Sequence, residues 1–199
     1  LNVDLHMHSN ASDGQLSPSE LILRAEKNDV DMMSLTDHDS INGIAEAMEC
    51  AEGKKLLLIP GVEISVTWGR LTLHVLGLNI DPLNNILSNA MQGIQDTRFE
   101  RAKLINQALV AGGLPSLLDE ALEEAGDPGQ ISRTHFARAM ISKNICSSTR
   151  EVFKNYLVSG KLGFVEHKWP SLKNAIDWIK MANGLAVLAH PARYELSLT

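Results

Sequence analysis

The order of apolar segments in the first part of the chain constrains the fold more than any other feature. Short apolar runs of the kind that forms buried strands lie at residues 3–6, 32–35 and 56–66. Helical patterns separate these runs, and a turn at residues 68–70 leads into a further strand at residues 71–78. The order strand, helix, strand, helix, strand is typical of right-handed βα units on a mainly parallel sheet, so the sequence predicts an α/β fold.

Capping residues mark where the helices of this pattern begin. Ser17 is placed as an N-cap, with Pro18 at the first helical position and Glu20 completing a capping box. We expect Asp39 or Ser40 to cap the second helix in the same way. The predicted helices therefore start where the chain leaves each strand and its following loop.

From about residue 83 to residue 160 the pattern becomes helical only. One long amphipathic stretch is followed by shorter helical segments, at residues 94–110, 117–125, 134–142 and 149–157. The βα pattern then resumes with a helix capped by Ser171 and a strand at residues 185–190. We expect an α/β domain at residues 1–82, a helical insertion that caps the substrate at residues 83–160, and the α/β domain continued at residues 161–199.

Composition narrows the class of protein. A chain of 199 residues with 44% apolar and 21% charged residues is ordinary for a soluble domain with a substantial core. No apolar run approaches the ~20 residues that span a bilayer, and no DNA-binding motif is present, so neither a membrane nor DNA is an expected partner. The net charge of −6 argues against a polyanion-coating protein. The two cysteines form no C-x-x-C, which favours reduced thiols in a cytoplasmic protein.

Potential metal ligands fall at one kind of position. Most lie at or just beyond the C-terminal ends of predicted strands: His6, His8, Asp37, His38, Glu63 and His190. In βα barrels and open α/β sheets, active sites assemble at that edge. His74 instead lies in the middle of a predicted strand, and the stagger of a neighbouring strand would have to bring it to the others.

Each of these residues has a second interpretation when it is taken alone. His6 and His8 point to the same side of an extended segment and can reach one ion, but they can equally be hydrogen-bonded to core polar groups. An H-x-H arises by chance in roughly one such sequence in four, so the pair is a weak signal. Glu63 is harder to explain without a cation, because an unpaired carboxylate in an apolar strand is costly. A dication stabilises such a carboxylate, which can then bridge two ions.

The combination of these residues favours metal chemistry. Mixed histidine and carboxylate ligands suit zinc, manganese or iron, and the cysteine pattern excludes a thiolate site. Clusters of such ions usually perform hydrolysis, in which a metal-bound hydroxide attacks while the ions polarise phosphoryl oxygens.

The motifs resemble those of a known family in both content and order. D-L-H-M-H-S-x-x-S-D-G is followed by T-D-H-D, P-G-V-E-I-S, L-H-V-L-G and A-V-L-A-H-P-A-R-Y. These motifs are similar to those of the PHP (polymerase and histidinol phosphatase) family of metal-dependent phosphoesterases. The resemblance implies a distorted (β/α)7 TIM-like barrel with three divalent ions. Manganese is the expected working metal, with iron or zinc as alternatives.

The resemblance also implies a ligand set. The first ion would be held by His6, His8 and Glu63, the second by Glu63, His74 and His190, and the third by Asp13 and His38. Asp4 and Asp37 would orient these ligands. Family members continue with a G-x-E-V-type strand and a G-S-D-F-H motif, which do not occur before Thr199. We therefore expect the C-terminal part of the barrel, and one ligand each of the first and third ions, to be absent from this chain.

The helical insertion points to one subgroup of the family. I-S-R-T-H-F-A-R and G-F-V-x-H-K-W are similar to segments of members that act on nucleoside 3′,5′-bisphosphates or, as 5′-to-3′ exoribonucleases, on short RNA. The catalytic residues implied are Glu63, His38, Arg133 and His135. Arg133 and His135 are the expected phosphate contacts, since guanidinium matches phosphate geometry, although Arg133 can also belong to a solvated helix face. Further candidates for substrate binding are Lys161, His167 and Arg193. Lys168 and Trp169 can contact a base, although Trp169 can equally belong to the core.

The expected activity is metal-dependent release of phosphate from nucleotides, either nucleoside 3′,5′-bisphosphates or 5′-nucleotides. Two alternatives remain within the class: stepwise 5′-to-3′ hydrolysis of short RNA, and hydrolysis of histidinol phosphate, which the R-T-H-F-A-R segment disfavours. An alternative of another class is a non-catalytic module that binds nucleotides. No pattern in the sequence specifies an oligomeric state.

Overall fold

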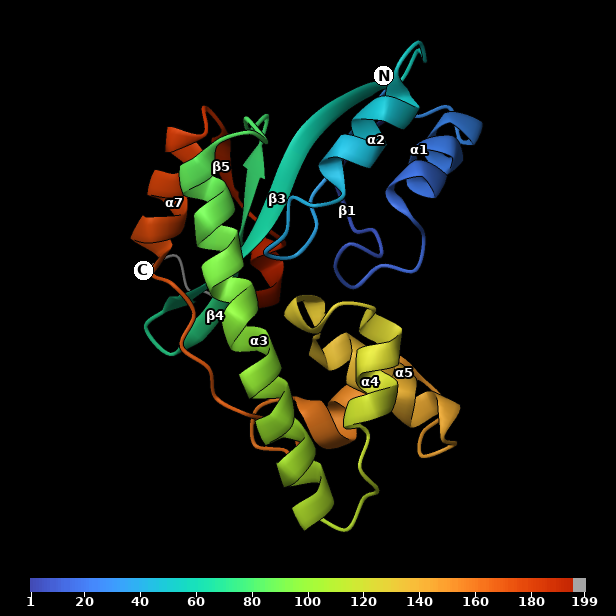
Figure 1. Cartoon of the computed structure of the whole chain (residues 1–199), viewed down its shortest axis with the longest axis vertical. Helices are drawn as coiled ribbons and strands as arrows, with labels where there is room; N and C mark the ends of the chain where they lie inside the picture. Colours follow the sequence, from blue (N-terminus) through green and yellow to red (C-terminus); the bar gives the residue numbers. More distant parts are fainter. Residues whose placement is uncertain (195–199) are drawn as a thin grey trace. The chain divides into compact units, whose positions relative to one another are not determined.

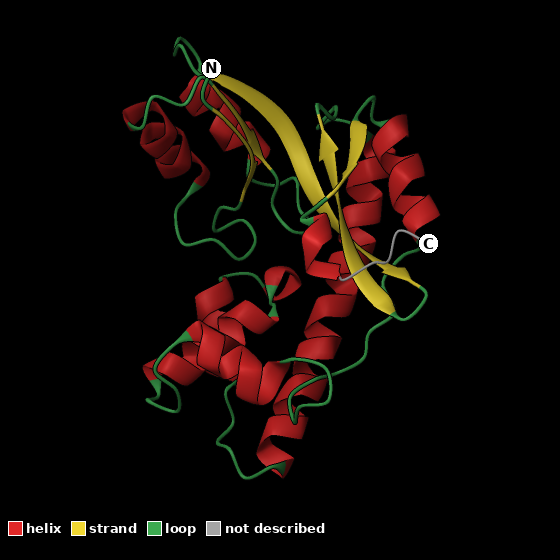
Figure 2. Ribbon diagram, turned by 180° about the vertical axis from the view of Figure 1, so that it is seen from behind, coloured by secondary structure: helices red, strands yellow, loops and turns green. Residues whose placement is uncertain are grey.

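The computed structural model describes residues 1–194. The chain forms two compact units, one made of Leu1–Ile94 and Lys168–Thr199 and the other of Gln95–His167. We call the first the sheet unit and the second the helical unit (Figures 1 and 2). The helical insertion was expected at residues 83–160, and the helical unit covers residues 95–167.

A five-stranded mixed sheet forms the centre of the sheet unit. Its strands follow the chain order: β1 (Val3–Met7), β2 (Met32–Leu35), β3 (Leu57–Trp68), β4 (Leu71–Leu78) and β5 (Leu185–Leu188). β1, β2 and β3 pair in parallel, whereas β4 is antiparallel to both β3 and β5. The two-residue connection at Gly69, which has a φ of 60°, makes β3 and β4 a hairpin. The predicted strands are confirmed. The pairs of β4 with β3 and with β5 are antiparallel, whereas βα units alone would give a parallel sheet.

Three helices lie wholly within the sheet unit, α1 (Pro18–Lys27), α2 (Ile44–Ala51) and α7 (Leu172–Met181). The predicted capping box is confirmed, because the Ser17 hydroxyl accepts from the Glu20 N–H and the Glu20 carboxylate accepts from the Ser17 N–H. The predicted Ser171 cap of α7 is also confirmed. The prediction that Asp39 or Ser40 caps α2 is wrong. α2 begins after Gly43 without a side-chain cap, because the Asp39 carboxylate is buried and binds β3 instead.

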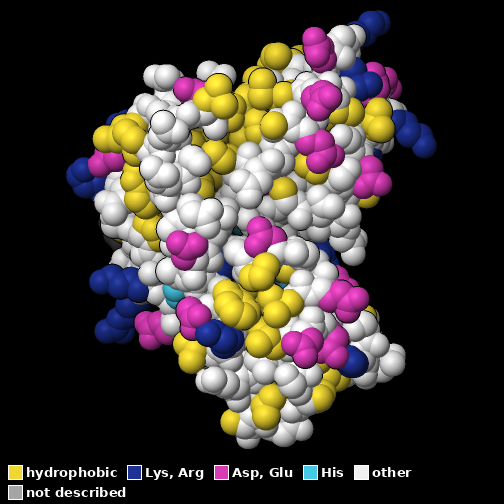
Figure 3. Space-filling model, in the orientation of Figure 1, with side chains coloured by type: hydrophobic (Ala, Val, Ile, Leu, Met, Phe, Trp, Pro, Cys, Tyr) yellow, Lys and Arg dark blue, Asp and Glu magenta, His cyan; other side chains and the backbone are white. Residues whose placement is uncertain are grey.

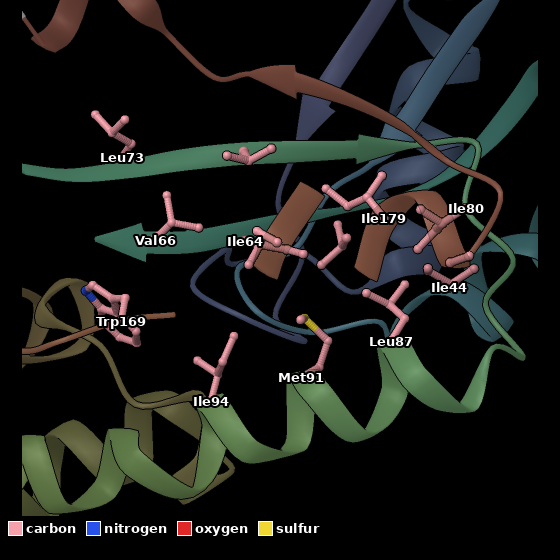
Figure 4. Close-up of a cluster of buried hydrophobic side chains, with 14 residues drawn as sticks. Ile44, Ile64, Val66, Leu73, Ile80, Leu87, Met91, Ile94, Trp169 and Ile179 are labelled. Atoms are coloured by element: carbon pink, nitrogen blue, oxygen red, sulfur yellow. The ribbon is translucent and has the colours of Figure 1, made fainter. Parts of the chain in front are cut away.

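Two apolar clusters hold the sheet unit together. One lies between β3, β4, the first part of α3 (Asn85–Ala111) and α7 (Figure 4), and includes Ile64, Leu87, Met91 and Ile179. The other packs α1 and α2 against β1 and β2. Truncating a fully buried residue such as Ile64 to alanine would cost roughly 2–5 kcal/mol of folding free energy. β3, the strand that carries Glu63, contributes to both clusters, with Ile64 in the first and Leu58 packed against the second.

The helical unit has its own core. Its elements after α3 are α4 (Leu118–Ala125), η1 (Pro128–Gln130), α5 (Arg133–Ser142), α6 (Thr149–Val152) and the π-helical turn η2 (Phe153–Leu157). They pack around buried residues that include Leu109, Phe136 and Met140. α3 starts nine residues before the amphipathic stretch predicted at residues 94–110, because its first turns pack on the sheet. Within residues 1–194, no helix combines the length and apolar character needed to cross a bilayer.

Candidate metal centre

A single buried carboxylate stands at the centre of the site. Glu63, on β3, has 1% of its side-chain surface exposed. Five imidazoles approach its two oxygens. The Oε2 atom lies 3.0 Å from Nε2 of His6, 3.0 Å from Nε2 of His8 and 3.3 Å from Nδ1 of His38. The Oε1 atom lies 3.0 Å from Nδ1 of His74 and 3.1 Å from Nε2 of His190. Both oxygens of Glu63 therefore face histidine nitrogens.

The five imidazoles form a closed ring around this carboxylate. Going round the ring, neighbouring centroids are 5.1 Å apart for His6 and His8, 4.5 Å for His8 and His38, 4.8 Å for His38 and His74, 5.2 Å for His74 and His190, and 5.7 Å for His190 and His6. Strand positions far apart in the sequence thus converge on one point. Asp13 adds a second carboxylate, with Oδ1 3.4 Å from Nδ1 of His8.

Strand alternation and register place these side chains. His6 and His8 are two residues apart at the end of β1, so both point to the same face. His38 follows β2 and forms an isolated parallel bridge with Glu63. In the antiparallel ladder Glu63 lies opposite Leu76, which puts His74 at the diagonal position on the same face. The hairpin register therefore explains how a mid-strand histidine joins residues at strand ends.

His190 comes to the ring through an irregular backbone just after β5. Its φ is 32°, and the preceding Ala189 donates its N–H to the His74 carbonyl at 3.0 Å. The hydroxyl of Tyr194, in the short turn η3 (Pro191–Tyr194), accepts the His74 N–H at 2.9 Å. The Tyr194 ring lies 5.4 Å from that of His190. Tyr194 was not among the predicted site residues, although it ends the H-P-A-R-Y motif that contains His190.

A hydrogen-bonded loop connects His8 to Asp13. The buried carboxylate of Asp37 accepts from the Ser9 N–H at 2.7 Å, and from the hydroxyls of Ser9 and Ser12 at 2.6 Å each. A Cβ at Gly14 would lie 2.2 Å from the His8 carbonyl oxygen, so only glycine fits where the loop closes. The S-D-G segment is therefore a tight turn that also presents a carboxylate to His8.

The charges in the ring are strongly coupled. Burial favours a neutral Glu63, but hydrogen bonds from His6, His74 and His8 outweigh it and hold the pKa of Glu63 well below its usual range. Burial also opposes protonation of His8, yet Asp13 and Glu63 raise the pKa of His8 to about 10. For His38 burial prevails and lowers the pKa to about 4. The carboxylate is thus ionised, and His38 is neutral at pH 7.

The donor atoms suit divalent ions. Two overlapping groups have ligand atoms within 4.8 Å of one another, His6 with Glu63 and His190, and His8 with His38 and Glu63. The Nδ1 atoms of His8 and His38 come within 3.4 Å of a carboxylate oxygen, yet neither makes a hydrogen bond in the described part of the chain. An ion would satisfy such buried nitrogens. Imidazole and carboxylate donors together fit zinc, manganese or iron.

The residues expected to bind substrate lie in both units. Arg193 is an exposed residue of η3, close enough to His190 to act on its charge. Four others belong to the helical unit, Arg133, His135, Lys161 and His167. His135 is buried, and its Nδ1 accepts the Ser132 N–H at 3.0 Å. Of the two interpretations of Trp169, the core position is confirmed.

Comparisons with known proteins place the chain in a family. The model of the PHP domain matches residues 4–183, and the chain belongs to the PHP family. Among curated proteins, the 3′,5′-nucleoside bisphosphate phosphatase of Chromobacterium violaceum is 43% identical over all of this chain and 70% of its own length. The 5′-3′ exoribonuclease Rnm of Escherichia coli is 41% identical over 98% of this chain and 67% of its own length. The resemblance expected from the motifs is confirmed.

Solved structures agree with this assignment. An amidohydrolase from Chromobacterium violaceum, determined with bound sulfate and no metal, matches all of this chain and 70% of its own with a TM-score of 0.96 and 43% identity. A Bifidobacterium adolescentis protein described as a metal-dependent phosphoesterase matches all of this chain and 71% of its own, with a TM-score of 0.91 and 27% identity. The metal dependence given in the description of the Bifidobacterium adolescentis protein is consistent with the ring of histidines around Glu63.

Proposed function

We propose that this protein is a metal-dependent phosphoesterase that releases phosphate from nucleotides, either nucleoside 3′,5′-bisphosphates or 5′-nucleotides. One observation carries the proposal: a buried, ionised carboxylate is ringed by five imidazoles, all within 3.3 Å of its oxygens. The name of the Chromobacterium violaceum relative supports the choice of substrate class.

Three divalent ions are proposed, with manganese as the working metal and iron or zinc as alternatives. His6, His8 and Glu63 would hold one ion, Glu63 with His74 and His190 a second, and Asp13 with His38 a third. Divalent ions bound there supply a nucleophile from water at neutral pH and stabilise charge on phosphoryl oxygens. The two oxygens of Glu63 face different sets of histidines, which supports its role between two ions.

The remaining roles fall to residues that orient ligands or neutralise charge. Asp37 fixes the loop from Ser9 to Asp13 and so holds a proposed ligand in place. Arg133 and His135 are proposed to neutralise charge on the phosphate, with Lys161, His167 and Arg193 as further contacts. The five-stranded sheet is proposed to belong to a distorted (β/α)7 barrel, and membership of the PHP family supports this.

The test is product analysis with purified, manganese-loaded protein. On adenosine 3′,5′-bisphosphate the proposed phosphatase releases inorganic phosphate and adenosine 3′- or 5′-phosphate. On a short 5′-phosphorylated RNA, the second candidate activity instead releases mononucleotides one at a time, which the Escherichia coli relative favours. Histidinol phosphate is tested alongside as a phosphate ester that is not a nucleotide, because its hydrolysis is the remaining alternative within the class. Nucleotide binding without any product, at full metal content, would instead identify a non-catalytic module.

A further inference from the structure

Gly93 lies in the interior of α3, where a glycine weakens the helix. Glycine is less favourable than alanine in a helix interior, because its backbone loses more conformational freedom on folding. Gly93 is exposed, and a Cβ built on it would have no other part of the described chain within 4 Å. An alanine would therefore fit there without rearrangement, and packing does not account for the glycine.

The apolar face of α3 changes from one core to the other just after Gly93. Three of its buried residues pack in the core of the sheet unit (Figure 4) and three in the core of the helical unit, namely Leu87, Met91 and Ile94, and then Ala102, Ile105 and Leu109. None of residues 95–101 belongs to either apolar cluster. The boundary between the units falls between Ile94 and Gln95. Gly93 is therefore within one helical turn of the point where α3 passes from one unit to the other.

The chain passes between the units a second time in a segment without helix or strand, residues 164–170. On the side of the helical unit, Nε2 of His167 lies 3.2 Å from the hydroxyl of Thr97 on α3. On the side of the sheet unit, the Trp169 N–H donates to the hydroxyl of Thr67 on β3 at 2.9 Å. Only one residue separates these two anchored positions, and it is exposed. Rotation between the units can therefore be confined to one residue in this segment.

We propose that Gly93 and Lys168 are the two hinge points about which the helical unit changes its orientation relative to the sheet unit. A hinge needs only a few residues that absorb a change in backbone dihedral angles between bodies that stay intact. Gly93 meets this requirement because no Cβ restricts its backbone. Lys168 meets it because it lies outside every helix and strand. Each unit has its own apolar core, so each can turn as one body.

The hinge supplies a step for substrate entry and product release. Arg133 and His135, the proposed phosphate contacts, belong to the helical unit, whereas the ring around Glu63 belongs to the sheet unit. A nucleotide that binds groups of both units favours one orientation, and rotation at the hinge then releases the product. This use of the hinge rests on the proposed function, whereas the hinge itself does not.

Pulsed electron paramagnetic resonance between one spin label in each unit tests the hinge in the metal-free protein. The labels are attached at Lys27→Cys in α1 and Glu124→Cys in α4, which are both exposed positions, and the two native cysteines are replaced by alanine in every version. We expect a broad distribution of distances in this reference protein, and Gly93→Ala to make the distribution no more than half as wide. The matched control is Gln107→Ala, which introduces the same residue at an exposed position of α3 inside the helical unit and leaves the width unchanged.

Gly93→Ala should fold, since an alanine in a helix interior is more stable than a glycine, and its Tm should rise by about 1–4 °C. A single narrow distance in the reference protein, or a Gly93→Ala distribution as broad as that of the reference, would overturn the hinge.

Phosphate release from adenosine 3′,5′-bisphosphate by the manganese-loaded protein is measured separately. Gly93→Ala should lower kcat several-fold at unchanged metal content, because a stiffer hinge slows product release. A distribution that narrows in Gly93→Ala, with no phosphate release from any version, counts against the proposed activity alone. Equal widths with normal phosphate release count against the hinge alone.

Discussion

Asp39 accepts two hydrogen bonds from Ser65, one from the backbone N–H at 2.7 Å and one from the hydroxyl at 2.8 Å. Ser65 lies two residues beyond Glu63 on β3. On the other side of His38, the Asp37 carboxylate binds the loop that carries Asp13. His38 is therefore held between two buried carboxylates, each of which fixes a different element that bears a proposed ligand.

We predict that Asp39→Ala lowers the free energy of unfolding by about 2–4 kcal/mol, because it leaves two buried donors of Ser65 without an acceptor. Urea denaturation of the metal-free protein measures this change. Glu123→Ala, which removes an exposed carboxylate from α4, is the control and should stay within about 0.5 kcal/mol of the wild type. Equal midpoints for the two variants would refute the structural role of Asp39.

Local signals in the sequence predict the elements well. The capping box of Ser17 and Glu20 is confirmed because both partners lie within one helical turn, where sequence spacing determines contact. Asp39 shows where local signals fail, because an aspartate can either cap a helix or accept hydrogen bonds from a neighbouring strand in the core. The acceptor role of Asp39 depends on how β3 lies beside it, and no local pattern contains that information.

Part of the candidate site could likewise be predicted from the sequence, and part could not. Convergence of His6, His8 and Glu63 could be predicted, because strand alternation and the shared edge of parallel strands are properties of the pattern. The approach of His74 depends on the β3–β4 register, and the contact of Tyr194 with the His74 N–H depends on a turn 120 residues later in the chain. The periodicity of the sequence carries no information about such tertiary contacts.

We predict that Glu63→Gln abolishes turnover and lowers the manganese content of the purified protein, because the amide removes the one carboxylate facing all five imidazoles. The protein should remain folded, since the amide has nearly the same shape. Elemental analysis, phosphate release and far-UV circular dichroism measure the three properties. A folded variant with wild-type metal content would contradict the central position of Glu63 in the site.

The opposite pKa shifts of His8 and His38 predict a pH dependence of metal binding. Imidazole binds metal only when neutral. With a pKa of about 10, His8 is protonated at neutral pH in the metal-free protein, whereas His38, with a pKa of about 4, is already neutral. Binding should therefore release one proton from His8, and the affinity for manganese should rise about tenfold per pH unit between pH 6 and 8.5.

Calorimetry in two buffers of different ionisation enthalpy counts the released protons. The His8→Ala variant is the control for this measurement, since it should bind manganese more weakly but with a smaller dependence on pH. A pH-independent affinity in the wild type would show that His8 is neutral or does not bind the ion.

Tyr194→Phe tests whether a residue outside the proposed ligand set positions His74. The change removes only the hydroxyl that accepts the His74 N–H, so it should cost about 1 kcal/mol of stability and weaken manganese binding about tenfold. Tyr156→Phe makes the same chemical change at a residue of the helical unit and should alter neither property. Because a purely structural role would lower stability alone, a Tyr194→Phe variant with wild-type manganese affinity would exclude a positioning role for this tyrosine.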